Sequence, residues 1–93
     1  MAVDVRIYTT TYCGYCTAAK SLLQRRGVPF QEVDCTRDPD TRRWLIEQTG
    51  QRTVPQIFIS GVPVGGYDEL SRLDRGGRLP SILAGDDSPP SVL

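Results

Sequence analysis

The sequence contains no histidine. It also has no net charge, because 11 basic residues balance 11 acidic ones. The absence of histidine excludes His-ligated zinc, Cys–His catalysis and the Ser–His–Asp triad. Zero net charge provides no basic field that would attract nucleic acid through its phosphates. The three cysteines are too few for a four-thiolate zinc site in one chain, and their odd number argues against a secreted disulfide framework.

Long apolar runs are also absent from the sequence. No stretch approaches the roughly 18 apolar residues that a membrane-spanning helix needs. The N-terminal segment carries Asp4 and Arg6 within its apolar stretch and does not resemble a signal peptide. We therefore expect a cytoplasmic protein whose thiols are kept reduced. A length of 93 residues is that of one small domain.

The apolar pattern predicts an α/β fold with the element order β-α-β-α-β-β-α, followed by one more helical turn. The strands are expected at about residues 3–8, 30–35, 56–60 and 62–64, the helices at about 14–26, 39–49 and 67–75, and the last turn at about 79–83. The first βαβ unit predicts two parallel strands joined by a right-handed crossover. The result is a four-stranded mixed sheet flanked by three to four helices.

The end of the chain is expected to have two distinct features. A tight turn at Gly61 makes the last two strands antiparallel, and Pro63 indicates that the final strand lies at an edge of the sheet. Residues 1–85 then form the domain. Residues 86–93 are rich in Pro, Ser and Asp, and we expect them to be a flexible tail.

A Cys-Gly-Tyr-Cys motif at residues 13–16 lies where the first predicted strand ends and the first helix begins. A helix N-terminus offers unpaired N–H groups and the positive end of the helix dipole, and both favour the thiolate form of Cys13. Cys16 lies one turn further along the same helix face and should be more buried and less acidic. The motif therefore predicts Cys13 as the nucleophile and Cys16 as the resolving thiol.

The cysteines also allow less reactive interpretations. The pair could be two ordinary buried cysteines or half of a zinc site shared between two chains, although its place at a strand-to-helix junction favours redox chemistry. Cys35 stands alone at the end of a predicted strand. A free cysteine in such a place commonly behaves as a small buried apolar residue, so we interpret Cys35 as structural.

Three segments of the chain resemble the glutaredoxin family. They are residues 7–16 with the Cys-Gly-Tyr-Cys motif, residues 53–59 with Thr-Val-Pro-Gln-Ile-Phe-Ile, and residues 65–70 with Gly-Gly-Tyr-Asp-Glu-Leu. The resemblance implies a thioredoxin-like fold and a dithiol enzyme that uses glutathione to reduce protein disulfides and protein–glutathione mixed disulfides. Its partners are then glutathione and these protein substrates, without nucleic acid or membrane, and we expect a monomer.

The resemblance also implies a glutathione-binding set of residues. It places Pro55 as a cis-proline that turns the backbone of Val54 towards the cysteines, where the cysteinyl unit of glutathione pairs as an added strand. The helix start at Tyr67 suits the γ-glutamyl carboxylate, and the Asp68 carboxylate suits the neighbouring ammonium group. Arg42 holds the glycyl carboxylate in this scheme. The whole set is Tyr15, Arg42, Thr53, Val54, Pro55, Gly66, Tyr67 and Asp68. In the less specific interpretation, Asp68 only complements the helix dipole and Arg42 is a solvated surface residue.

Two positions depart from the pattern of many family members. Thr10 stands where many have a lysine, which leaves one cation fewer for the glycyl carboxylate unless Arg52 supplies it. Gly14 stands in place of the common proline, as in members that bridge a [2Fe–2S] cluster between two subunits. An alternative function is therefore a cluster-bridged dimer, a scaffold or sensor, with Cys13 and glutathione as ligands. A third alternative is reduction by thioredoxin reductase instead of glutathione.

Overall fold

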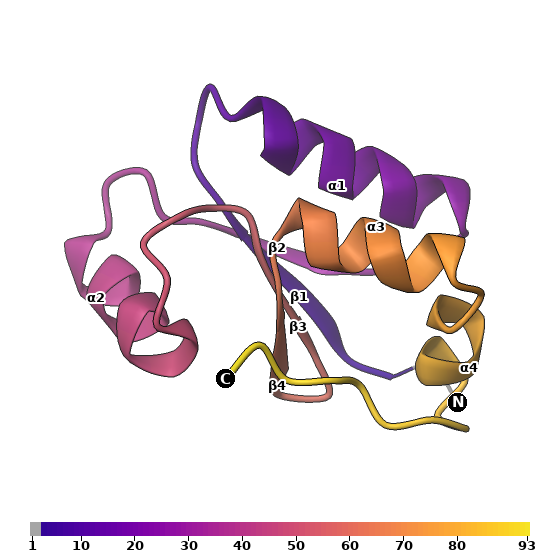
Figure 1. Cartoon of the computed structure of the whole chain (residues 1–93). Coiled ribbons are helices and arrows are strands. Elements are labelled where there is room, and N and C mark those ends of the chain that lie inside the picture. Colours follow the sequence, from indigo (N-terminus) through magenta and orange to yellow (C-terminus); the bar gives the residue numbers. More distant parts are fainter. Residues whose placement is uncertain (1–2) are drawn as a thin grey trace.

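A computed structural model describes residues 3–93 of the chain (Figure 1). These residues form four strands and four helices in the order that the sequence predicts. The strands are β1 (Val5–Thr9), β2 (Gln31–Asp34), β3 (Gln56–Ile59) and β4 (Val62–Gly65), and the helices are α1 (Gly14–Arg25), α2 (Pro39–Thr49), α3 (Tyr67–Arg75) and α4 (Leu79–Leu83). None of these helices is long and apolar enough to cross a membrane.

The strands form one mixed sheet in the order β2-β1-β3-β4. β1 is parallel to β2, to which α1 connects it, and antiparallel to β3. β3 and β4 form an antiparallel hairpin, which leaves β4 at the edge of the sheet. Pro63 lies in this edge strand, where a residue without a backbone N–H is tolerated. The predicted pairings and the predicted edge are both confirmed.

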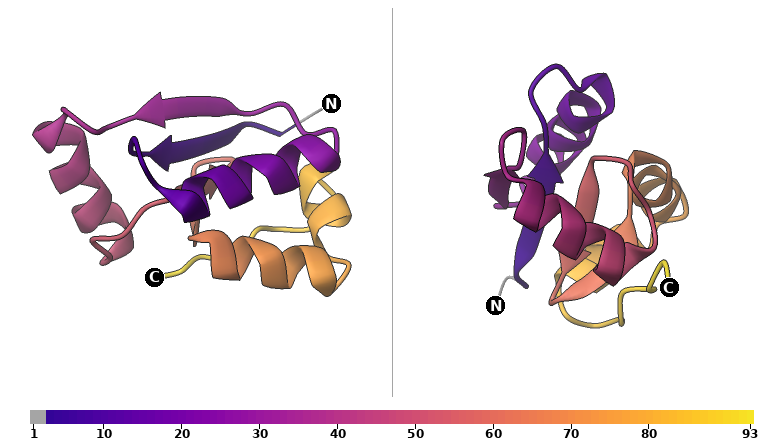
Figure 2. Two further views of the ribbon diagram at one scale, coloured as in Figure 1. Left: turned by 90° about the horizontal axis from the view of Figure 1, so that it is seen from above. Right: turned by 90° about the vertical axis from the view of Figure 1, so that its left-hand side faces the viewer.

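The helices cover both faces of the sheet. α1 and α3 pack together on one face, and α2 lies against the other (Figures 1 and 2). The main apolar core fills the first interface with side chains such as Ile7, Leu23, Ile57 and Leu70. A smaller cluster of Tyr8, Cys35, Leu45 and Phe58 lies beneath α2. The alternation along β1 explains the division, because Ile7 and Tyr8 point to opposite faces.

The ends of the elements follow local chemistry. Asp38 caps α2, since its Oδ1 accepts a hydrogen bond of 3.1 Å from the N–H of Thr41. Gly50 ends α2 with a left-handed φ of 69°, as its position predicts. The observed bounds differ from the predicted ones by at most two residues, and those of α2, α3 and α4 agree with them. β2 is shorter than predicted at both ends, because Phe30 and Cys35 flank the strand instead of belonging to it.

The segment after α4 follows the edge of the sheet. Arg78 and Asp87 form an ion pair of 3.3 Å, and the N–H of Val92 donates a hydrogen bond of 2.7 Å to the carbonyl of Pro63. One backbone group of the edge strand is thereby paired. No further element forms in residues 86–93, and the flexibility of this tail stays a prediction.

Candidate active site

Cys13 occupies the N-cap position of α1, between the end of β1 and the first helical turn. Its Sγ accepts a hydrogen bond of 3.1 Å from the backbone N–H of Cys16. On the other side, the thiol faces the carbonyl oxygen of Val54 at 3.7 Å. The side chain is half-buried. A helix N-terminus thus directs a donor at a sulfur that remains accessible, which is the arrangement that stabilises a thiolate.

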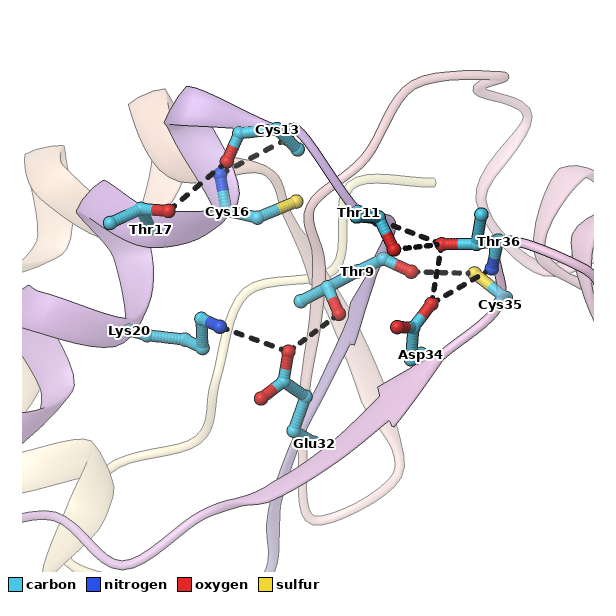
Figure 3. Close-up of polar contacts among 10 residues, drawn as sticks. All are labelled: Thr9, Thr11, Cys13, Cys16, Thr17, Lys20, Glu32, Asp34, Cys35 and Thr36. Carbon is cyan, nitrogen blue, oxygen red and sulfur yellow. Dashed lines mark hydrogen bonds and ion pairs between the residues drawn. The ribbon is translucent and has the colours of Figure 1, made fainter.

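The loop before Cys13 is held in place by Asp34 at the end of β2 and by Thr36, two residues beyond it. Tyr12 adopts a left-handed φ of 61°, which lets the chain reverse between β1 and α1. The hydroxyl of Thr36 accepts a hydrogen bond of 2.7 Å from the N–H of Thr11 and donates one of 2.6 Å to Asp34 (Figure 3). Hydrogen bonds from Thr36 lower the pKa of Asp34. This network fixes the turn that presents the nucleophile.

Cys16 differs from Cys13 in its surroundings. Only 2% of its surface is exposed. Burial, followed by the interaction with Cys13, raises the pKa of Cys16 to about 12. The prediction that the second cysteine is the more buried of the two is therefore confirmed. The two thiols have distinct environments, as a nucleophile and a resolving thiol require.

A groove of about 330 Å³ opens beside Cys13, on the side of the Val54 carbonyl. Its lining comprises Tyr15, Gln51, Thr53, Val54, Pro55, Gly66, Tyr67, Asp68 and Glu69. The peptide bond between Val54 and Pro55 is cis, as the resemblance implies. Seven of the eight residues in the predicted glutathione-binding set therefore meet in one groove.

The walls of this groove come from three elements. Tyr15 of α1 and Tyr67 of α3 lie across from each other, with ring centroids 6.1 Å apart. Gly66 approaches the loop so closely that a Cβ would lie 3.2 Å from the carbonyl oxygen of Pro55. Glu69 accepts a hydrogen bond of 3.1 Å from the N–H of Gly66. The N-terminus of α3 is thus packed directly against the cis-proline loop, which explains the small residue at this position.

Arg42 is the one member of the predicted set that does not line the groove. Its guanidinium donates a hydrogen bond of 3.0 Å to the carbonyl of Arg52. It also interacts with the buried thiol of Cys35 and opposes the rise in the pKa of that thiol. Arg42 thus holds the loop that leads to the groove, and its contact with a glycyl carboxylate stays a prediction.

The same loop is held by two further side chains that the sequence interpretation missed. The hydroxyl of Thr49 accepts a hydrogen bond of 3.0 Å from the N–H of Gln51. The buried side-chain amide of Gln56 donates to the carbonyl of Thr53 at 2.9 Å and to the side chain of Gln51 at 3.0 Å. Gln56 stands in a strand whose other residues are apolar. The signal in the sequence is a polar side chain at the first position of an otherwise apolar strand. Because this amide is buried, its N–H groups need partners.

Cys35 is remote from this chemistry. Only 1% of its surface is exposed, and its thiol donates a hydrogen bond of 3.1 Å to the carbonyl of Thr9 (Figure 3). Burial raises the pKa of Cys35, which keeps it protonated at neutral pH. The environment is that of a buried apolar side chain, in agreement with the structural interpretation.

The residues between 3 and 93 include no group of three or more His, Cys, Asp or Glu side chains that could hold a metal ion. Cys13 and Cys16 alone supply at most two of the four ligands that a [2Fe–2S] cluster needs. A bridging cluster would therefore require ligands from outside the chain.

Comparison with known proteins places these features in a family. The glutaredoxin family model matches residues 5–64. The chain is 50% identical over 80 residues to a glutaredoxin of Pseudomonas aeruginosa, covering 86% of this chain and 95% of that protein. It is 44% identical over 80 residues to glutaredoxin 3 of Escherichia coli, and the match covers 86% of this chain and 96% of that protein. The buckwheat glutaredoxin–glutathione complex superposes with a TM-score of 0.84 at 33% identity, covering 90% of this chain and 79% of that one.

A mixed sheet of this order, a Cys-x-x-Cys motif at the start of α1 and a cis-proline facing it define a thioredoxin-like thiol–disulfide oxidoreductase. Within that class, the chain belongs to the glutaredoxin family. The resemblance drawn from three short segments is thereby confirmed, together with the predicted fold and the assignment as an enzyme.

Proposed function

We propose that this protein uses glutathione to reduce protein–glutathione mixed disulfides and protein disulfides. The observation that carries the proposal is the position of the Cys13 sulfur. It lies between the N–H of Cys16 and the carbonyl of Val54, at the edge of the groove that the predicted glutathione-binding residues line. The reaction needs free thiols, and all three cysteines are free, so we propose that the protein acts in the reducing cytosol. We also propose that it acts as a monomer, because each step below needs the cysteines of one chain only.

Deglutathionylation requires only Cys13. Its thiolate attacks the glutathionyl sulfur of the mixed disulfide, a new bond joins Cys13 to glutathione, and the protein leaves as a thiolate that takes up a proton. A second glutathione thiolate then attacks the glutathionyl sulfur on Cys13. Glutathione disulfide is released and Cys13 is free again, so the electrons come from glutathione alone.

Reduction of a protein disulfide also requires Cys16. Cys13 attacks one sulfur of the substrate and forms a mixed disulfide with it. Cys16 then attacks the sulfur of Cys13, so that an internal disulfide forms and the second substrate thiol leaves. Two glutathione molecules reduce the internal bond. The short spacing of the two cysteines on one helical turn makes this second attack intramolecular.

Turnover of a glutathionylated peptide tests the proposal. The purified protein is mixed with the peptide, glutathione and glutathione reductase, and NADPH consumption is followed. We expect turnover that depends on glutathione. Turnover only after thioredoxin reductase has replaced glutathione and glutathione reductase in the mixture would instead favour reduction by thioredoxin reductase. Absence of turnover under both conditions would overturn the proposal.

Asp68→Asn should weaken the use of glutathione. Asp68 is exposed at the start of α3 and lines the groove, where we propose that its carboxylate pairs with the γ-glutamyl ammonium. An exposed ion pair contributes little, so we expect the KM for glutathione to rise about two- to tenfold with kcat nearly unchanged. Asp86→Asn makes the same charge change outside the groove and is the matched control. Equal KM values in the two variants would contradict the role of Asp68.

Gln56→Leu should impair the same binding step through the loop. The change removes both donors that hold Thr53 and Gln51 while keeping the volume of a buried side chain. Loss of one or two hydrogen bonds to the loop predicts a rise in the KM for glutathione of about two- to tenfold, with kcat retained at saturation. Gln48→Leu, on the exposed face of α2, is the control. A fall in kcat at unchanged KM would argue against positioning of the loop.

A further inference from the structure

A second groove, of about 460 Å³, lies on the other side of the cysteine pair. It is formed between α1 and the ends of β1 and β2, and both cysteines take part in its lining. Three charged residues line it as well, namely Lys20, Glu32 and Asp34. The proposed reaction places glutathione in the first groove and therefore does not use the charged residues of this second groove.

Lys20 lies one turn beyond Cys16 on the same face of α1. Figure 3 shows both side chains extending from the helix towards β1 and β2. The ammonium of Lys20 is held at 3.0 Å by a carboxylate oxygen of Glu32. That oxygen also accepts a hydrogen bond of 2.7 Å from the hydroxyl of Thr9. The cation is therefore anchored to the sheet, in the groove that the resolving thiol also lines.

Lys20 is the only cation among the residues that line this groove. The other charged or titratable residues that line this groove with Cys16 are Tyr12 and Cys13 before α1, Lys20 on α1, and Glu32 and Asp34 on β2. Burial and Cys13 raise the pKa of Cys16, whereas the backbone of Thr10 and, to a smaller extent, the charge of Lys20 act in the opposite direction. Lys20 is thus the one side chain among these groups that favours ionisation of a thiol that must attack as a thiolate.

We propose that Lys20 is a positioning residue for the resolving step, in which its ammonium, anchored by Glu32, stabilises the Cys16 thiolate that attacks the Cys13 mixed disulfide. This inference rests on the proposed function. In the step, the Cys16 thiol gives its proton to solvent and its sulfur bonds to that of Cys13. The bond between Cys13 and the substrate sulfur breaks, and the leaving thiolate takes up a proton. No other oxidant or reductant is needed.

The resolving step can be isolated in a single turnover. Protein carrying glutathione on Cys13 is prepared at acidic pH and free glutathione is removed. After a jump to neutral pH, attack by Cys16 releases one glutathione per molecule, which rapid quenching and mass spectrometry measure. Cys16→Ser gives the rate without a resolving thiol.

Charge substitutions then distinguish the electrostatic effect of Lys20 on the Cys16 thiol from any structural effect of the ion pair between Lys20 and Glu32. A tenfold change in thiol acidity alters the rate about three- to fourfold, because nucleophilicity falls as acidity rises. We expect Lys20→Gln to slow release by about this factor and to move its pH profile to higher pH. Glu32→Gln should accelerate release and move the profile to lower pH, since it leaves the cation unneutralised. Lys20→Arg keeps the charge and should retain the wild-type rate.

The two neutral variants distinguish this proposal from a structural role. Both break the same ion pair, so a structural role would shift the rate in the same direction in Lys20→Gln and Glu32→Gln. Equal shifts, or no effect of Lys20→Gln, would overturn the role of Lys20 and leave the proposed function intact. Wild-type release no faster than that of Cys16→Ser would overturn both this inference and the resolving role of Cys16.

Discussion

Cys13→Ser is expected to abolish both the deglutathionylation and the disulfide reduction that we propose. Both reactions begin with attack by the Cys13 sulfur, and a serine hydroxyl is not ionised at neutral pH. The N–H of Cys16 stabilises a thiolate but is no general base, and the chain has no histidine that could activate a hydroxyl. Turnover of a glutathionylated peptide, and of a disulfide-containing protein, should fall below detection.

The fold of this variant should remain intact, which makes its loss of activity interpretable. Serine is among the favoured N-cap residues, so its hydroxyl can accept the hydrogen bond that the Cys13 sulfur now accepts from Cys16. We expect a thermal unfolding midpoint within a few degrees of the wild type, because a replaced cap changes stability by about 1 kcal/mol or less. Residual turnover at more than a trace would show that another thiol is the nucleophile.

Local chemistry predicts much of the fold because several elements are marked at their ends. Asp38 and Pro39 begin α2 and Gly50 ends it, as capping preferences require. Pro63 marks β4 as an edge strand because it has no N–H. The bounds of β2 are less predictable, since an apolar residue such as Phe30 can flank a strand and still pack against the core.

The active site is only partly predictable for a physical reason. The motif at Cys13 and Cys16 is local, so its place at a helix start follows directly from the sequence. The groove instead combines the starts of α1 and α3 with the loop before β3, which only the folded sheet brings together. Arg42 illustrates the difference. Its position in α2 is predictable, but the acceptor of its guanidinium, the carbonyl of Arg52, depends on the path of the loop.

Cys16→Ser is expected to separate the two proposed activities. Deglutathionylation should continue near the wild-type rate, because glutathione itself regenerates Cys13. Disulfide reduction should be lost, since the mixed disulfide between Cys13 and its substrate has no intramolecular thiol to resolve it. Turnover of the glutathionylated peptide and of the protein disulfide, measured in parallel, gives the comparison. Continued reduction of the protein disulfide at the wild-type rate would contradict the resolving role.

The activation of Cys13 should survive this substitution because it comes from the backbone of residue 16. The N–H that donates to the Cys13 sulfur is present whatever side chain the residue carries. The side chain itself is buried, so a serine hydroxyl there costs about 1–3 kcal/mol if it finds no partner. Cys16→Ala avoids that buried hydroxyl and is the matched second variant. If both variants deglutathionylate but neither reduces disulfides, the separation arises from the lost thiol and not from altered stability.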